Sequence, residues 1–217
     1  MDFKAGEIFA IDKPYRISSF GALAHVRYVL SRTLGYKVKI GHAGTLDPLA
    51  TGVLILCTGK ATKRIEEFQG QTKEYTATLQ LGATTASYDM EHEVNASFPT
   101  EHITRELIND TLPQFIGDIE QIPPTYSAVK VNGDRAYELR RAGEEVKLKP
   151  KHIHIDEIEV VDFDVEKMQL SLRVVCGKGT YIRALARDLG RALNSGAYLT
   201  ALRRTRVGDF TIDRCLD

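Results

Sequence analysis

The stretch GHAGTLDPLATGVLILCTG, residues 41–59, decides the fold and draws attention to one carboxylate. It opens with a turn that is rich in residues suited to tight turns, Gly41, Gly44, Pro48 and Gly52. The apolar run at residues 53–57 follows directly and predicts a buried strand. Asp47 therefore lies beside the core, where a charged side chain costs free energy unless a partner or a reaction uses it.

Asp47 has three other readings. It can be an ordinary turn residue, because Asp-Pro and glycine are common turn formers. A phosphate-binding nucleotide loop is not supported, because Ala61 follows Gly59-Lys60 and Leu54 stands where the first glycine of such a loop belongs. A metal site is not supported either, since His42 and Asp47 alone make a poor ligand set.

The pattern of apolar residues predicts a mixture of strands and helices without regular alternation. Expected strands are residues 8–11, 53–57, 75–81, 153–165, 168–175 and 207–212. Expected helices are a helix capped by Ser18 or Ser19 and ended by Gly35, then residues 61–68, 104–115 with a break at Pro113, and 181–193. Residues 121–151 are rich in proline, glycine and charge and predict an extended insertion with a brief helix near residues 137–142. These expectations favour the α+β class with a largely antiparallel sheet.

Length and composition predict a globular protein of the cytoplasm. The 217 residues, 43% hydrophobic and 27% charged, allow one large domain or two small ones. No apolar run reaches the ~18 residues of a membrane span, and the first residues lack the features of a signal peptide. Three scattered cysteines without a CxxC pair argue against a disulfide framework or a zinc site.

Charge is segregated along the chain although the net charge is zero. Residues 84–120 hold eight acidic residues against one arginine, whereas residues 176–206 hold seven basic residues against one aspartate. Such segregation can present a basic face to nucleic acid. The alternative is that helix surfaces carry charge in any case.

Three further residues have both a structural and a functional interpretation. Tyr75 opens a strand, where it can pack in a sheet or stack on a base. His42 can bind local backbone or a ligand phosphate or base. Arg183 falls in the first turn of a helix that follows two glycines, where the helix dipole disfavours a cation unless an anion meets it. That conflict predicts a partner for Arg183, with Asp47 as the candidate.

Several blocks in one order carry a resemblance to a known family. They are Asp12-Lys13-Pro14 with Ser18-Ser19, GHAGTLDPLATGVL, Lys73-Glu74-Tyr75, QIPPTYSAVK at residues 121–130, KGTYIR at residues 178–183, and Leu202-Arg203-Arg204. Over nearly its whole length the chain resembles the bacterial tRNA pseudouridine-55 synthases, the TruB-type branch of the pseudouridine synthases. The block GTLDPLATG is highly specific.

The resemblance implies a pseudouridine synthase fold that isomerises a uridine in the T-arm of tRNA, with no cofactor and no metal. It implies that residues 121–151 form a thumb-like segment that closes on the RNA. Catalytic positions carried over from the family are Asp47, Tyr75 and Arg183. Positions that line the pocket or hold the flipped nucleotide and its phosphates are His42, Tyr75, Tyr181, Leu202, Lys13 and Lys63.

The chain also departs from the family pattern. Arg16 replaces a common glycine after Asp12-Lys13-Pro14, and Ala86, Ser87 and His92 replace frequent Asp, Thr and Gly. Arg16 is expected to change the loop that presents Lys13. The changes at residues 86, 87 and 92 are expected to leave the fold intact but put any RNA contact there in doubt. We expect a single catalytic domain over residues 1–217, without the C-terminal PUA-type RNA-binding domain of many relatives, acting as a monomer.

The residues leave two questions open. Asp47 can attack the sugar, attack the base, or deprotonate the sugar to give a glycal. The protein can also be a non-catalytic RNA-binding protein or RNA chaperone, or a synthase that acts on another RNA. A pure binder has no use for an aspartate beside phosphates, so Asp47, Tyr75 and Arg183 together favour the enzyme.

Overall fold

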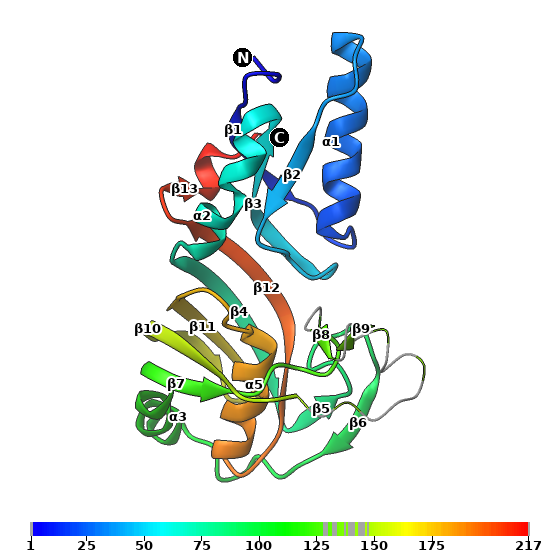
Figure 1. Cartoon of the computed structure of the whole chain (residues 1–217). Helices are drawn as coiled ribbons and strands as arrows, with labels where there is room; N and C mark the ends of the chain where they lie inside the picture. The colour runs from blue at the N-terminus through cyan, green and yellow to red at the C-terminus, as the bar shows by residue number, and fades with distance from the viewer. Residues whose placement is uncertain are drawn as a thin grey trace. The chain divides into compact units, whose positions relative to one another are not determined.

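The computed structural model describes residues 2–127, 130–131, 134–136, 138, 142, 146 and 148–216. The chain divides into two compact units, one made of the residues up to Thr76 together with those from Ala201 onward, the other of Ala77–Thr200. Strands β4 (Lys73–Leu81) and β12 (Ala197–Val207) contain the points at which the chain passes between units (Figure 1). The expectation of one catalytic domain over residues 1–217 stays a prediction.

Strand β3 (Ala50–Thr58) is the centre of the first unit. It pairs antiparallel with β1 (Ile8–Lys13) and with β2 (Ile40–Ala43). It pairs parallel with β12, where Leu202 lies opposite Ala50. The short strand β13 (Phe210–Thr211) pairs antiparallel with β12. The strand that was predicted at residues 53–57 is therefore confirmed, and it is longer than predicted.

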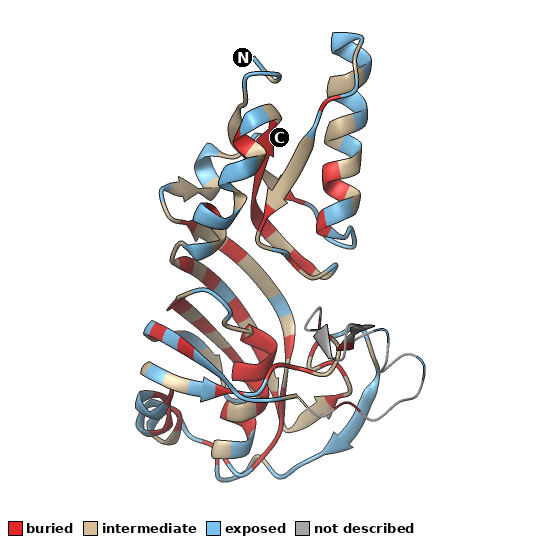
Figure 2. Cartoon of the chain, viewed as in Figure 1, coloured by how far each residue is buried: buried red, intermediate tan, exposed pale blue. Residues whose placement is uncertain are grey.

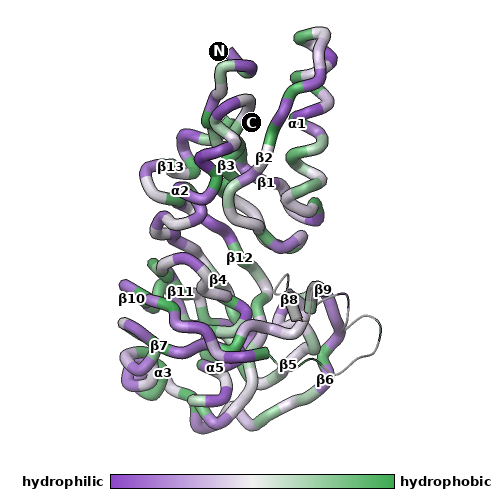
Figure 3. The backbone as a smooth tube through the Cα atoms, viewed as in Figure 1, coloured by the Kyte–Doolittle hydropathy of each residue, from purple (hydrophilic) through white to green (hydrophobic). Residues whose placement is uncertain are grey.

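Both faces of β3 are covered, which explains its unbroken apolar sequence (Figures 2 and 3). Leu54 and Leu56 pack with Ala22 and Leu23 of helix α1 (Ser19–Leu34). Residues of the other face pack in a second cluster, Val53, Ile55, Cys57, Ala61, Phe68 and Val207. Alternate side chains of an extended strand point to opposite faces, so a strand between two layers needs apolar residues at every position.

The helices of the first unit begin and end largely as the sequence predicts. The Ser18 side chain accepts a hydrogen bond from the Gly21 amide at 3.0 Å, and Gly35 ends α1 at φ 73°. The helix that was predicted at residues 61–68 is instead divided into a 3-10 helix, η1 (Gly59–Arg64), and a short α-helix, α2 (Ile65–Gly70).

The second unit contains an antiparallel sheet in the order β4-β11-β10-β7. Its strands are β7 (Gly117–Gln121), β10 (Lys151–Asp164) and β11 (Gln169–Cys176), together with the end of β4. The predicted hairpin of residues 153–175 is confirmed. A separate hairpin joins β5 (Ala83–Thr85) to β6 (Val94–Ser97).

Two helical segments of the second unit confirm their predictions. Helix α3 (Arg105–Thr111) is capped by Thr104 and is followed by the 3-10 helix η2 (Leu112–Phe115), so the break at Pro113 is present. Helix α5 (Ile182–Ala192) is largely buried (Figure 2). Gly190 permits close approach of the chain, because a Cβ there would lie 2.5 Å from the Ala197 nitrogen.

The prediction for the C-terminal strand is confirmed only in part, because the final strand, β13, lies within the expected range but is shorter than expected. A strand was expected at residues 207–212, but β12 already ends at Val207, and a turn and the two-residue β13 follow. β12 itself escaped prediction because its alternation includes arginine. Arg204 is buried together with Ala197, Leu199 and Val207, so a charged residue stands where the pattern calls for an apolar one.

The expected insertion begins at the last residue of β7 and ends at the first residue of β10. Within it, β8 (Lys130–Val131) pairs antiparallel with β9 (Asp134–Arg135). The brief helix predicted near residues 137–142 falls mostly outside the described residues. The thumb-like role of this segment stays a prediction.

Candidate active site

The turn that carries Asp47 is fixed on both sides by hydrogen bonds within the first unit. The Arg204 guanidinium donates to the Gly44 carbonyl at 2.9 Å. The buried Ser19 hydroxyl donates to the Leu46 carbonyl at 2.9 Å and accepts from its amide at 2.8 Å. Beyond Asp47, the Pro48 carbonyl accepts from the Arg16 amide at 2.9 Å. The backbone therefore holds the half-buried Asp47 in one place.

Arg204 is the site residue that the sequence did not single out. It is 1% exposed, and its Nε donates to the Val53 carbonyl at 2.8 Å. Its backbone lies so near Gly52 (φ 107°) that a Cβ there would meet the Arg204 oxygen at 2.1 Å. The available signal was the block Leu202-Arg203-Arg204, from which only Leu202 was assigned a role. Arg204 thus brings a permanent positive charge to the Asp47 turn.

Lys13 lies at the end of β1 and is fully buried. Its ammonium donates to the carbonyls of Pro14 at 2.8 Å and Ile17 at 2.6 Å. The pKa of Lys13 is lowered to about 8, chiefly by burial; the carboxylate of Asp47 opposes this change, and the positive charge of Arg204 adds to it. The predicted residues Lys13 and Asp47 are therefore electrostatic neighbours.

This lowered pKa predicts a pH-dependent stability. The folded protein releases the Lys13 proton near pH 8, whereas the unfolded chain keeps it to about pH 10.5. Between these values the unfolded chain binds more protons, so the contribution of Lys13 to the free energy of unfolding rises with pH, by up to about 1.4 kcal/mol per pH unit. Urea unfolding of the wild type and of Lys13→Met at several pH values measures this contribution of Lys13 to the free energy of unfolding. Identical pH slopes in the two proteins would contradict the prediction.

His42 lies on β2, opposite Leu56 of β3. Burial and the charge of Arg204 both lower the pKa of His42, so the imidazole is neutral at pH 7. Its buried Nδ1 has no hydrogen-bond partner among the described residues. A buried polar atom of this kind is costly unless a ligand engages it, which favours the predicted role in substrate binding.

Substitutions of the neighbouring serines Ser18 and Ser19 test two different effects, because Ser18 caps helix α1 and Ser19 binds the backbone of Leu46, next to Asp47. We expect Ser19→Ala to lower stability by about 1–3 kcal/mol and to reduce turnover, because the Leu46 amide and carbonyl lose their buried partner. Ser18→Ala removes only the helix cap and should cost about 1 kcal/mol with turnover unchanged. Equal turnover in the two variants, measured below their unfolding transitions, would show that Ser19 does not position Asp47.

Three more predicted residues, Tyr75, Leu202 and Lys63, belong to the first unit. Tyr75 is 7% exposed on β4, and Leu202 on β12 pairs with Ala50, three residues after Asp47. Lys63 on η1 lines a cavity whose lining includes no other predicted site residue.

Arg183, predicted to be a partner of Asp47, belongs to the second unit. It is 4% exposed and donates to the carbonyls of Ser87 at 3.1 Å and Tyr126 at 2.9 Å. Its Nε lies 3.8 Å from an oxygen of the Asp89 carboxylate. The helix-dipole argument required an anion near Arg183, and Asp89 is one that the sequence did not indicate. The pairing of Arg183 with Asp47 stays a prediction.

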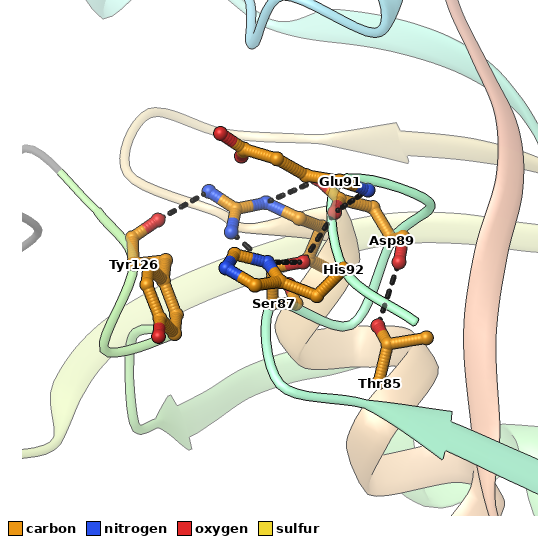
Figure 4. A network of polar contacts seen from close by, with 7 residues as sticks. Thr85, Ser87, Asp89, Glu91, His92 and Tyr126 are labelled. Carbon is orange, nitrogen blue, oxygen red and sulfur yellow. Dashed lines mark hydrogen bonds and ion pairs between the residues drawn. The ribbon is translucent and has the colours of Figure 1, made fainter. Parts of the chain in front are cut away.

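Residues of the segment that departs from the family pattern form a network of polar contacts (Figure 4), and the Ser87 carbonyl of this segment accepts a hydrogen bond from Arg183. The Ser87 hydroxyl donates to the Asp89 carboxylate at 2.5 Å and lies 2.9 Å from Nδ1 of His92. The His92 ring contacts the Tyr126 ring, with centroids 4.5 Å apart. The substituted residues Ser87 and His92 thus belong to a polar network that touches the arginine through the Ser87 carbonyl.

Tyr181, at the entry of α5, is held through its backbone. The side chain of Gln121 accepts from the Tyr181 amide at 2.9 Å and donates to its carbonyl at 3.1 Å. Gln121 is 2% exposed, and this two-point contact is partly buried. It fixes the start of the helix that carries Arg183.

The predicted basic face is partly wrong. Arg183, Arg187 and Arg204 are buried, with exposed fractions of 4%, 7% and 1%, so three of the seven basic residues counted at residues 176–206 contribute no surface. Each donates hydrogen bonds to backbone carbonyls. The guanidinium groups of these three arginines hold backbone carbonyls inside the protein and do not face solvent.

Within the described part of the chain, no group of three histidine, cysteine or acidic side chains is arranged to hold a metal ion. Among the helices of the same residues, none has the length and apolar character needed to cross a membrane.

Comparisons with known proteins give consistent matches over the chain. Residues 31–182 match the N-terminal domain of TruB family pseudouridylate synthases, and residues 183–217 match the tRNA pseudouridylate synthase B C-terminal domain. The chain is 62% identical to tRNA pseudouridine synthase B of Bacteroides fragilis over 100% of this chain and 93% of the relative. It is also 50% identical to tRNA pseudouridine synthase B of Flavobacterium johnsoniae, over 100% of this chain and 94% of that relative.

Among solved structures, a chain from the crystal structure of a Cbf5-Nop10-Gar1 complex is similar with a TM-score of 0.70 and 29% identity. The match covers 96% of this chain and 50% of that chain, so this chain spans about half the length of that structural relative.

Proposed function

Because the chain belongs to the TruB family of pseudouridylate synthases, we propose that it isomerises the T-loop uridine of tRNA to pseudouridine, with Asp47 as the catalytic carboxylate. The observation that carries the proposal is the fixed turn of Asp47 beside Lys13 and Arg204. Lys13 and Arg204 bring positive charge to this turn.

The chemistry fits a single carboxylate. The isomerisation breaks a C–N glycosidic bond, turns the base, and forms a C–C bond to the same sugar. Substrate and product have the same formula, so the reaction needs no oxidant or reductant. A carboxylate can act as a nucleophile or accept a proton while the base is detached. Hydrolysis of glycosides differs, because it uses a pair of carboxyl groups.

The other predicted residues receive roles around the flipped base. Tyr75 stacks on the target base and is placed to assist removal of the C5 proton, and Arg183 pairs with Asp47. The residues assigned to binding of the nucleotide and its phosphates are His42, Tyr181, Leu202, Lys13 and Lys63. The assignment of His42 is supported by its Nδ1, which has no hydrogen-bond partner in the described part of the chain. The segment of residues 121–151 is proposed to close on the T-arm as a thumb.

The proposal extends to the setting of the reaction. The enzyme is proposed to act as a monomer in the cytoplasm. Three cysteines without disulfide bonds, Cys57, Cys176 and Cys215, support a reducing compartment.

A direct experiment tests the reaction and its site together. The purified protein is incubated with an unmodified tRNA transcript, and pseudouridine is mapped at single-nucleotide resolution. The expected result is one new pseudouridine in the T-loop, absent from a transcript with cytidine at that position. Binding of the transcript without any product would overturn the proposal and favour an RNA-holding protein. Product elsewhere in the RNA would overturn the assignment of the substrate position.

A further inference from the structure

A cavity lined by lysine lies in the first unit. Its volume is about 340 Å³, and its lining residues are Phe3, Lys4, Tyr36, Lys37, Lys39, Gly59, Lys60 and Lys63. Five of these eight are lysines, and none is acidic. A second hollow of about 260 Å³ shares Lys37 and Lys39 and adds Arg27. The positive lining therefore continues beyond a single cavity. We call the first cavity, with its eight lining residues, the lysine cavity.

Close backbone contacts hold the three segments that form the lysine cavity. The Gly59 amide donates to the Lys39 carbonyl at 2.9 Å, which joins η1 to the start of β2. A Cβ at Gly59 (φ 48°) would lie 2.3 Å from the Lys4 carbonyl, so only glycine admits the N-terminal segment there. A Cβ at Gly6 would lie 2.6 Å from the Ala61 nitrogen. The cavity thus has a fixed frame.

The cations of the lysine cavity point to an anionic ligand. Its lysines are all exposed, and the ammonium of Lys4 lies 4.3 Å from the centre of the Tyr36 ring. The carboxylates nearest to Lys4 in sequence are engaged by the N-terminal backbone: Asp2 accepts from the amides of Lys4 and Ala5, and Glu7 accepts from the Asp2 amide. Five like charges in one hollow repel each other, and a polyanion relieves that repulsion.

We propose that the lysines of this cavity other than Lys63 bind backbone phosphates of the tRNA substrate, at nucleotides other than the reacting uridine. This inference rests on the proposed function for the identity of the RNA. Extended RNA fits better than a small anion, because the lysines come from three segments and continue into the second hollow, more charge than one phosphate needs. Each phosphate contact releases counterions and makes affinity depend on salt.

The test compares two double charge reversals in the full chain. Lys37→Glu/Lys60→Glu changes the lysine cavity and spares Lys63, which already has an assigned role. Arg105→Glu/Lys167→Glu makes the same change in net charge at exposed positions of the second unit. Dissociation constants for a tRNA transcript are measured from about 50 to 200 mM salt, and thermal unfolding confirms that both variants fold. Turnover at saturating tRNA is measured in parallel.

We expect Lys37→Glu/Lys60→Glu to weaken binding about tenfold or more at low salt, and the control to weaken it by less than about threefold. In the neutral variant Lys37→Gln/Lys60→Gln, the slope of log affinity against log salt should become shallower by about 1–2. Turnover at saturation should stay near that of the wild type. Equal losses in the cavity and control variants would overturn the inference, because net charge alone would then explain them.

Two other outcomes separate this inference from the proposed function. If the wild type forms no pseudouridine but the cavity variant still loses RNA affinity selectively, the proposed function fails and the RNA site stands. If the variant binds tRNA normally but loses binding of inorganic phosphate, which the wild type binds, the cavity is a small-anion site and the inference is wrong.

Discussion

Replacing Asp47 by asparagine is expected to abolish pseudouridine formation, with turnover at least about 10³-fold lower, while tRNA affinity stays within about threefold of the wild type. Asparagine has nearly the same shape as aspartate but cannot act as a nucleophile or accept a proton at neutral pH. The backbone bond from the Ala50 amide to the Asp47 carbonyl is independent of the side chain. The turn should therefore persist, and removal of a negative charge does not weaken RNA binding.

Single-turnover kinetics and equilibrium binding measure the two effects separately. A matched control is Asp209→Asn, an exposed carboxylate between β12 and β13 of the same unit. It should retain full turnover. If Asp47→Asn keeps more than a tenth of wild-type turnover, Asp47 is not the catalytic carboxylate. If it loses tRNA binding and turnover together, its role is structural or in substrate binding.

Replacing Gly52 by alanine is expected to have the largest effect on stability, about 4 kcal/mol or more. A Cβ there would lie 2.1 Å from the carbonyl oxygen of Arg204 and 2.8 Å from its nitrogen, and the backbone has φ 107°. Strand β12 would have to move away from β3, which breaks the parallel pairing of Arg204 with Gly52. The bonds of Arg204 to Gly44 and Val53 would be lost with it.

Gly35→Ala provides the matched control for backbone strain. Gly35 also has a positive φ, 73°, but a Cβ there would meet nothing within 4 Å. It should cost only about 1 kcal/mol, the ordinary penalty of a left-handed conformation. Urea denaturation of both variants gives the two values. Similar costs for Gly52→Ala and Gly35→Ala would mean that steric contact with β12 is not what requires glycine at Gly52.

Local patterns predicted the parts of the molecule that depend on neighbours in sequence. The strand β3, the capping of α1 by Ser18 and the break at Pro113 each follow from a few adjacent residues. The turn of Asp47 was likewise visible, because glycine and proline mark it directly. The family resemblance then supplied the roles of residues whose own patterns are ambiguous, such as Tyr75.

The parts that could not be predicted depend on contacts between distant segments. Arg204 looks like a surface residue in sequence, yet carbonyls at Gly44 and Val53, more than 100 residues away, make its burial favourable. Asp89 could not be recognised as a neighbour of Arg183 for the same reason. A count of charges cannot distinguish a buried arginine satisfied by carbonyls from one that faces RNA, so the predicted basic face was overestimated.

The division of the chain into units has a consequence for its synthesis. The second unit is one continuous segment, whereas the first needs residues from both ends of the chain. On the ribosome, residues up to Thr76 emerge first but wait for β12, which follows on the order of ten seconds later at ordinary elongation rates. Until Arg204 arrives, the carbonyls of Gly44 and Val53 lack their donor. The Asp47 turn therefore obtains its full set of hydrogen bonds only after the last part of the chain has been made.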